Sequence, residues 1–305
     1  MKPDRSTDPL RQDVRSGAAE LARRAISLFE EAIEAPGAED VDAFRAELVE
    51  LSLRILAAQP SMAGLVGLAA SVVRAASGTA DLEAARDEAR RAVVAFRTRL
   101  DQATREIAAR ADGLIPAGGR VLTLSSSSTV RLALLEAAKR RAFDVICLEG
   151  RPNLEGRELA AALAGAGIRV TLAVDAAICA LIRGCDVVLC GADSIGDLGV
   201  VNKIGTRAAA LAARSAGIPI YALADTSKIL PAGFPQPVED DRPGHEVWPD
   251  APPGVTIWNR YFEATPLSLF AGVVTEEGLR TADELDRIRS SIEVPAELRR
   301  HLFQT

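Results

Sequence analysis

The chain has 305 residues, of which 48% are hydrophobic and 26% charged, so it can bury one large core or two ordinary ones. Its 36 basic and 42 acidic residues leave a net charge of -6, which argues against the broad basic surface of a nucleic-acid-binding protein. Two histidines and four cysteines lack the number and spacing of a zinc site, so we expect no metal, and we expect no cofactor. Neither a signal peptide nor a membrane span is visible, and we expect a cytoplasmic protein.

The first third of the chain has helical periodicity. Between residue 8 and about residue 112, apolar side chains recur every three or four positions, and Glu and Arg fill the opposite face. Breaks rich in Pro, Gly and Ser at 35–37, 59–61 and 77–79 divide this region into about four helices. We therefore predict an N-terminal helical domain over residues 1–115.

The pattern changes at Gly118, after which short β-rich runs alternate with segments of helical length. The runs are 121–124, 144–148, 170–174, 186–190 and 218–223. Strands that are apolar throughout and separated by helices are typical of a parallel sheet covered on both faces. We predict an α/β fold in which residues 116–305 form a Rossmann-like parallel sheet with helices on both faces. Residues 231–256, with seven prolines, are expected to form a long irregular insertion.

Polar residues follow the first predicted strand. Five consecutive hydroxyl side chains, at 125–129, lead from this strand into a helix. The carboxyl ends of parallel strands bind ligands, and a helix N-terminus attracts anions, so this hydroxyl run is a candidate phosphate site. The alternative is a polar loop with an N-cap.

Charged residues follow the later strands. Arg151 follows the second strand, and its guanidinium can donate two parallel hydrogen bonds to a phosphate or carboxylate. The alternative role for this side chain is an ion pair with Glu149 or Glu155. Asp193 follows the fourth strand, and two roles are open for it: its carboxylate caps a helix, or it transfers protons if burial raises its pKa.

Lysine is rare in this chain, which has 32 arginines and only four lysines. Lys203 stands beside Asn202 in a predicted turn ahead of a helix, and Lys228 follows the fifth strand. Both lysines and Arg151 are expected at the same sheet edge as the hydroxyl run and Asp193. This convergence predicts a pocket for a small phosphorylated molecule.

Five segments carry a family resemblance. They are 123–128, 149–157, 174–177, 191–195 and 202–206, with the sequence Gly-Ala-Asp at 191–193 and Asn-Lys-Ile-Gly-Thr at 202–206. In order and spacing they resemble the initiation factor 2B alpha/beta/delta family, which includes ribose-1,5-bisphosphate isomerase and methylthioribose-1-phosphate isomerase. The resemblance implies a helical domain packed on a Rossmann-like domain, a homo-oligomer (a dimer or higher), and a small phosphorylated sugar or nucleotide as ligand.

The resemblance also implies roles for individual residues. In the isomerases, a cysteine after the first strand and the aspartate of the Gly-Ala-Asp motif form the acid/base pair, and here these positions hold Ser125 and Asp193. The residues that it assigns to substrate binding are Arg15, Ser126, Ser127, Ser128, Asn202, Lys203 and Lys228. A cysteine thiol has a pKa of about 8.5, whereas a serine hydroxyl is a poor acid.

Two functions therefore remain open at this point. The first is an aldose-ketose isomerase of the ribose-1,5-bisphosphate or methylthioribose-1-phosphate type. The second is a non-catalytic regulatory protein that binds a sugar or nucleotide phosphate and resembles the alpha subunit of initiation factor 2B.

Overall fold

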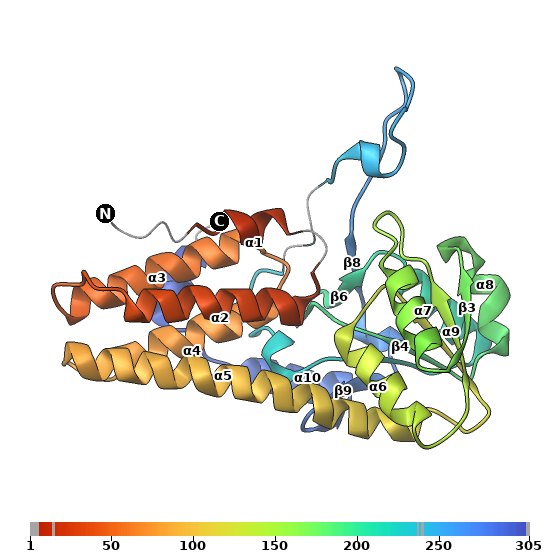
Figure 1. The fold of residues 1–305 in the computed structure, drawn as a ribbon, viewed down its shortest axis with the longest axis horizontal. Coiled ribbons are helices and arrows are strands. Elements are labelled where there is room, and N and C mark those ends of the chain that lie inside the picture. The colour runs from red at the N-terminus through yellow and green to blue at the C-terminus, as the bar shows by residue number, and fades with distance from the viewer. Residues whose placement is uncertain (1–5, 14–15, 237, 239–240, 303–305) are drawn as a thin grey trace.

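The computed structural model describes residues 6–13, 16–236, 238 and 241–302. A bundle of helices comes first in the chain and packs beside an α/β body (Figure 1). The bundle contains α1 (Asp8–Gln12), α2 (Ala18–Glu34), α3 (Val41–Ala58), α4 (Ala63–Ser77) and α5 (Leu82–Ala111). The helical first third of the chain is thus confirmed, with the three predicted breaks in place, but the end of α1 at Gln12 was not predicted.

The helices of the bundle bury one apolar face each. Phe29, Phe44 and Leu68, from three different helices, are fully buried in a common core. Two of the helices begin at an aspartate: the side chains of Asp40 and Asp81 each accept a hydrogen bond at 2.8 Å from a backbone N–H in the first turn. The last turns of α5 leave the bundle and pack in the core of the α/β body, so this helix ties the two together.

The main sheet has seven strands in the order β10-β9-β7-β4-β1-β2-β3. Its strands are β1 (Arg120–Leu124), β2 (Asp144–Leu148), β3 (Arg169–Ala173), β4 (Val187–Cys190), β7 (Ile220–Leu223), β9 (Gly272–Thr275) and β10 (Gly278–Arg280). All neighbours pair in parallel except β9 and β10. The five predicted strands are present, and the α/β class is confirmed.

Helices cover both faces of this sheet, as the sequence predicts. One face carries α6 (Ser128–Ala138), α7 (Glu155–Gly165) and the end of α5. The other carries α8 (Ile178–Leu181), α9 (Thr206–Ala216) and α10 (Ala282–Ser291). The sheet is therefore apolar on both sides, which explains its continuously hydrophobic strands.

A second, antiparallel sheet was not predicted. It has three strands, β5 (Ser194–Gly196), β6 (Gly199–Lys203) and β8 (Phe262–Thr265), in the order β5-β6-β8. Asn202 and Lys203 lie at the end of β6, so placing them in a turn was wrong. The pairing of β6 with β8 joins residues about 60 positions apart, and no local pattern reveals such a contact.

The last segment of the chain returns to the helical bundle. Val294 and Leu298, the latter in α11 (Ala296–Leu302), are buried in the bundle core, although the sequence placed them with the sheet. Residues 241–258, most of which belong to the proline-rich region, project from the body as an arm (Figure 1) with Trp248 and Trp258 exposed. None of the helices that the structure describes is long and apolar enough to cross a membrane.

Candidate functional site

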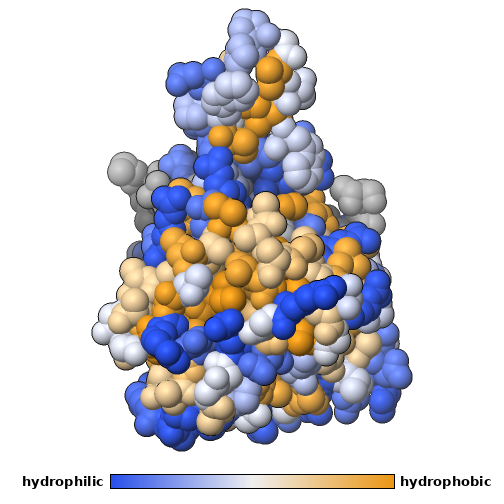
Figure 2. Space-filling view, turned by 90° about the vertical axis from the view of Figure 1, so that its right-hand side faces the viewer, coloured by the Kyte–Doolittle hydropathy of each residue, from blue (hydrophilic) through white to orange (hydrophobic). Residues whose placement is uncertain are grey.

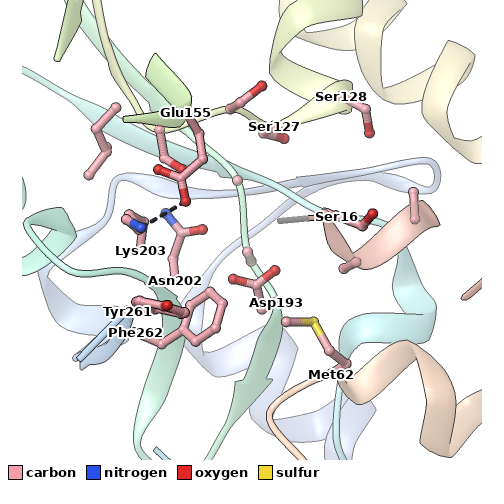
Figure 3. A pocket seen from close by; sticks show the side chains of 18 of the residues that line it. Ser16, Met62, Ser127, Ser128, Glu155, Asp193, Asn202, Lys203, Tyr261 and Phe262 are labelled. Carbon is pink, nitrogen blue, oxygen red and sulfur yellow. Dashed lines mark hydrogen bonds and ion pairs between the residues drawn. The ribbon is translucent and has the colours of Figure 1, made fainter. Parts of the chain in front are cut away.

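A pocket opens where the carboxyl ends of β1 and β4 meet the small sheet and the first turns of α2 and α4 (Figure 3). Its walls come from segments 16–19, 124–128, 191–193, 202–203 and 261–262, together with Met62, Asn153, Glu155 and Lys228. The pocket thus lies at the strand ends that the sequence indicates, and both the bundle and the sheet contribute to it.

The hydroxyl run forms the turn from β1 into α6. Ser125 adopts a left-handed backbone conformation, with φ of 59°, which redirects the chain after the strand. Ser127 is the N-cap of α6, and its side chain accepts a hydrogen bond from Val130 N at 3.4 Å. A β-carbon on Gly191 would lie 2.9 Å from Cβ and Oγ of Ser127, so only glycine fits beside this cap. The turn therefore caps the helix, as one alternative from the sequence has it, and also lines the pocket, while phosphate binding by its hydroxyls stays a prediction.

Two further helices begin at the pocket. Ala18 and Ala19, the first residues of the 17-residue helix α2, line it, and the N-cap Gly17 provides no side-chain cap. Met62 is the N-cap of α4 and also lines the pocket. The positive ends of three helix dipoles therefore lie around one cavity, an arrangement that favours an anion. Arg15, which the sequence predicts to bind substrate, lies outside the described residues.

Asp193 connects the small sheet to the helical bundle. Its backbone N–H donates to Val201 O at 2.9 Å, and its carbonyl oxygen accepts a hydrogen bond from Ala63 N at 3.2 Å. Figure 3 shows its carboxylate directed into the pocket, between the hydroxyl turn on one side and Asn202 on the other. The backbone of this residue is thus fixed from both sides while its side chain faces the cavity.

Lys228 ends the short helix η4 (Thr226–Lys228) and is 7% exposed. Its Nζ donates to Ala192 O at 2.7 Å, and no carboxylate in the described part of the chain pairs with it. Glu276 holds the start of η4 by accepting a hydrogen bond from Thr226 N at 3.0 Å. Burial, as the largest cause, raises the pKa of Glu276 above its ordinary value.

Lys203 is bound on two sides. Its Nζ lies 2.8 Å from Oε1 of Glu155 and 5.1 Å from the centre of the Tyr261 ring, and the residue is only 3% exposed. Neighbouring Asn202 donates from Nδ2 to Thr206 Oγ1 at 2.9 Å. The basic charge of Lys203 is therefore neutralised within the protein itself.

Glu155, Tyr261 and Phe262 line the pocket although the sequence reasoning gave them no role there. Glu155 begins α7, and its Oε2 and Ser125 Cα both lie near Gly150: a β-carbon on that glycine would be 3.0 Å from the oxygen and 3.4 Å from the Cα. The Glu-Gly-Arg sequence at 155–157 belongs to the resembling segments, so a role for Glu155 had a signal. The two aromatic residues had none.

The pocket brings together eight of the predicted residues: Ser125, Ser126, Ser127, Ser128, Asp193, Asn202, Lys203 and Lys228. Arg151 does not line it. This arginine is exposed and donates from Nη2 to Val247 O in the arm at 2.9 Å, while its backbone N–H and that of Gly150 donate to the Asp175 carboxylate after β3. The alternative ion pair is also absent, since Glu149 pairs with Arg157 at 2.9 Å. No group of three or more potential metal ligands occurs in the described part of the chain.

Comparison with known proteins agrees with this architecture. Residues 14–282 match the sequence model of the Initiation factor 2 subunit family. A protein of Pyrococcus horikoshii named putative translation initiation factor eIF-2B subunit 2-like is 32% identical over 92% of this chain and 97% of its own. A methylthioribose-1-phosphate isomerase of Geobacillus thermodenitrificans is 30% identical over 80% of this chain and 75% of its own. The crystal structure of translation initiation factor eIF-2B from Pyrococcus horikoshii superposes with a TM-score of 0.76 and 29% identity, over 90% and 95% of the two chains.

Proposed function

Because the chain belongs to the Initiation factor 2 subunit family, we propose that its pocket binds a sugar 1-phosphate and that Asp193 isomerises the bound aldose to a ketose. One observation carries the proposal: a carboxylate faces a cavity between helix N-termini and a second polar wall. The relative named methylthioribose-1-phosphate isomerase supports the choice of substrate class.

The phosphate is assigned to the side of the pocket where α2 and α6 begin. These helices have 17 and 11 residues, long enough for a full dipole at each N-terminus. Ser126 and Ser128 add hydroxyl donors, and Lys228 adds a cation without a carboxylate partner among the described residues. Such a set compensates locally for the net charge of -6, which repels an anion at long range.

Asp193 is assigned to proton transfer. The isomerisation breaks the bond between C1 and the ring oxygen, moves a hydrogen from C2 to C1 with its electron pair, and turns the C2 hydroxyl into a carbonyl. The net proton change is the loss of one proton from the 2-hydroxyl and the gain of one by the ring oxygen. A single carboxyl group between the two oxygens can carry that proton, first as acid toward the ring oxygen and then as base toward the 2-hydroxyl.

Phosphorus NMR with methylthioribose 1-phosphate tests this proposal. We expect a new ketose phosphate signal, and a decrease in its rate of about 100-fold or more in Asp193→Asn, with affinity within a few-fold of wild type. Asp101→Asn, at an exposed position on α5, is the matched control and keeps the wild-type rate. Full turnover by Asp193→Asn would contradict the role of Asp193.

A second function is favoured by Ser125 and by the relative named as an initiation factor subunit. A serine hydroxyl is a poor acid, and a chain with this residue in place of the thiol can keep the pocket without the reaction. This alternative predicts saturable binding of a sugar or nucleotide phosphate with no new phosphorus signal after hours. The same NMR experiment therefore distinguishes the two functions.

We also propose that the protein forms a dimer or higher homo-oligomer through an apolar edge face on β3 and α8. This face consists of Leu172, Val174, Ala176, Cys179 and Ala180, all exposed, with Leu172 46% and Val174 57% exposed. Figure 2 shows the side of the molecule that carries β3 and α8, with apolar residues gathered across its middle. β3 is an edge strand, and an exposed apolar edge favours pairing with a second chain.

Light scattering tests the oligomer. We expect a dimer or higher species for the wild type and a monomer for Leu172→Arg. Leu279→Arg, 48% exposed on the opposite edge strand β10, is the control and remains assembled. A monomeric wild type at micromolar concentration would contradict the proposal.

All four cysteines are free thiols, which supports our assignment to the cytoplasm, where thiols stay reduced.

A further inference from the structure

The two sides of the pocket differ in charge. Figure 3 shows Ser16, Ser127 and Ser128 on one side, Glu155, Lys203 and Tyr261 on the other, and Asp193 between them. Two helices begin on the first side. The first turn of α6 has no acidic residue, and the first turn of α2 has one, Glu20. We call the second side, formed by Glu155, Asn202, Lys203, Tyr261 and Phe262, the far wall.

The positive charges of the far wall are already neutralised by the protein. Lys203, 3% exposed, is paired with Glu155 at 2.8 Å. Glu155 is also the first residue of α7, where it compensates the positive end of that helix dipole. The N-terminus of α9, which follows Lys203, is occupied as well: Glu263 Oε1 accepts hydrogen bonds from Gly205 N at 2.7 Å and from Arg207 N at 2.9 Å.

Among the five residues of the far wall the one cation, Lys203, is already neutralised, so a phosphate would meet no free cation from this set. It would place a charge of about -1.5 to -2 beside the Glu155 carboxylate, in a wall with little water to screen the repulsion. The second oxygen of Glu155, Oε2, is buried and accepts no hydrogen bond. No hydrogen-bond donor therefore offsets the charge of this oxygen, and an added anion would increase the repulsion. The far wall therefore disfavours a dianion.

Uncharged groups fit the same wall. The Lys203 ammonium and the Asn202 amide can donate to sugar hydroxyls, and the rings of Tyr261 and Phe262 provide apolar surface. A sugar with one phosphate at C1 satisfies both sides of the pocket. A sugar with a second phosphate at C5 satisfies only one.

We propose that Glu155 is a specificity-determining residue: by neutralising Lys203 it makes the pocket accept a sugar monophosphate and reject a bisphosphate. The inference rests on the proposed function, since it assumes that a sugar phosphate binds here. It selects one of the two substrate classes that the sequence leaves open, and it removes Lys203 from the set of phosphate ligands.

Calorimetric titration with ribose 1-phosphate and ribose 1,5-bisphosphate tests the inference, because these probes differ only in the second phosphate. We expect the wild type to bind the monophosphate at least tenfold more tightly. Glu155→Gln keeps a hydrogen-bond acceptor for Lys203 but frees its charge, so the affinity ratio should move at least tenfold toward the bisphosphate. Glu155→Asp keeps the negative charge and should keep the wild-type preference.

Glu149→Gln is the matched control, because Glu149 lies in the same loop but pairs with Arg157 away from the pocket, and its ratio should equal that of the wild type. Thermal unfolding of each variant without ligand establishes that it is folded. An equal or greater wild-type affinity for the bisphosphate would overturn the inference, as would an unchanged ratio in folded Glu155→Gln. Failure of both probes to bind the wild type would instead overturn the proposed function, and the inference with it.

Discussion

Lys228 is the residue at which ligand binding and stability should separate most clearly. It is 7% exposed, and its ammonium donates to one neutral carbonyl, Ala192 O, at 2.7 Å. A buried ammonium without a counter-charge is costly in the free protein, but a bound phosphate would supply that counter-charge. The Lys228→Met substitution keeps the side-chain length and removes the charge.

The expected effect on affinity follows from the lost contact. A hydrogen bond to a charged group contributes about 1.5–3 kcal/mol, which corresponds to a Kd about 10–150-fold weaker for a sugar 1-phosphate. Without ligand, Lys228→Met should be at least as stable to heat as the wild type, because the desolvated charge is gone.

Titration calorimetry and thermal unfolding measure the two quantities. Lys139→Met is the control: Lys139 is exposed, pairs with Glu136 at 2.6 Å and does not line the pocket, so this change should leave affinity unaltered. An unchanged Kd in Lys228→Met would refute the reasoning. A loss of stability in the free protein that parallels the loss of affinity would refute it equally, since Lys228 would then have a structural role.

Three further predictions follow from burial and close packing. Gly156→Ala should lower the free energy of unfolding by about 1–3 kcal/mol or more in urea denaturation, because the new β-carbon would lie 1.9 Å from the carbonyl oxygen that ends β2; wild-type stability would show that the loop yields. Burial raises the pKa of Cys147 and Cys190 to about 12, so a maleimide at about pH 8 should label Cys179 alone in the folded, monomeric Leu172→Arg variant, and fast labelling of the other thiols would contradict their burial. Because burial raises the pKa of Glu276, the native state binds more protons than the unfolded state between the two pKa values, and this contribution to stability falls as pH rises through the native pKa. Glu276→Gln should therefore weaken the gain in stability that accompanies acidification from about pH 7 to pH 5, and an unaltered pH profile would contradict it.

Local patterns predicted the regular elements well. Strands such as β1 and β4 are buried on both faces, so their uninterrupted apolar residues distinguish them from amphipathic helices. The hydroxyl run at 125–129 and Asp193 follow these strands, and the rule that ligands bind at the carboxyl ends of parallel strands brought them to one place. That part of the site depends on chain order alone.

The remaining features depend on contacts between distant residues. The position of Lys203 on a strand is set by pairing with β8, in which Lys203 lies opposite Phe262. The partner of Lys203, Glu155, comes from the first turn of α7, 48 positions earlier. Charge alone suggested a free phosphate ligand at Lys203, and only the fold shows that this charge is already neutralised.

Arg151 illustrates the opposite error. Its place after a strand suggested a site residue, but the Asp175 carboxylate holds its N–H at 2.7 Å and its guanidinium contacts the arm. A strand end defines the position of a backbone, whereas the direction of a long side chain depends on neighbours that the sequence does not reveal.

Titration of methylthioribose 1-phosphate with the protein, followed by phosphorus NMR, tests the central claim most directly. If the N-termini of α2 and α6 hold the phosphate, the wild type should shift or broaden the phosphorus signal saturably, and Lys228→Met should require a higher concentration for the same effect. A phosphorus signal that remains sharp and unshifted at protein concentrations above that of the sugar would contradict the account.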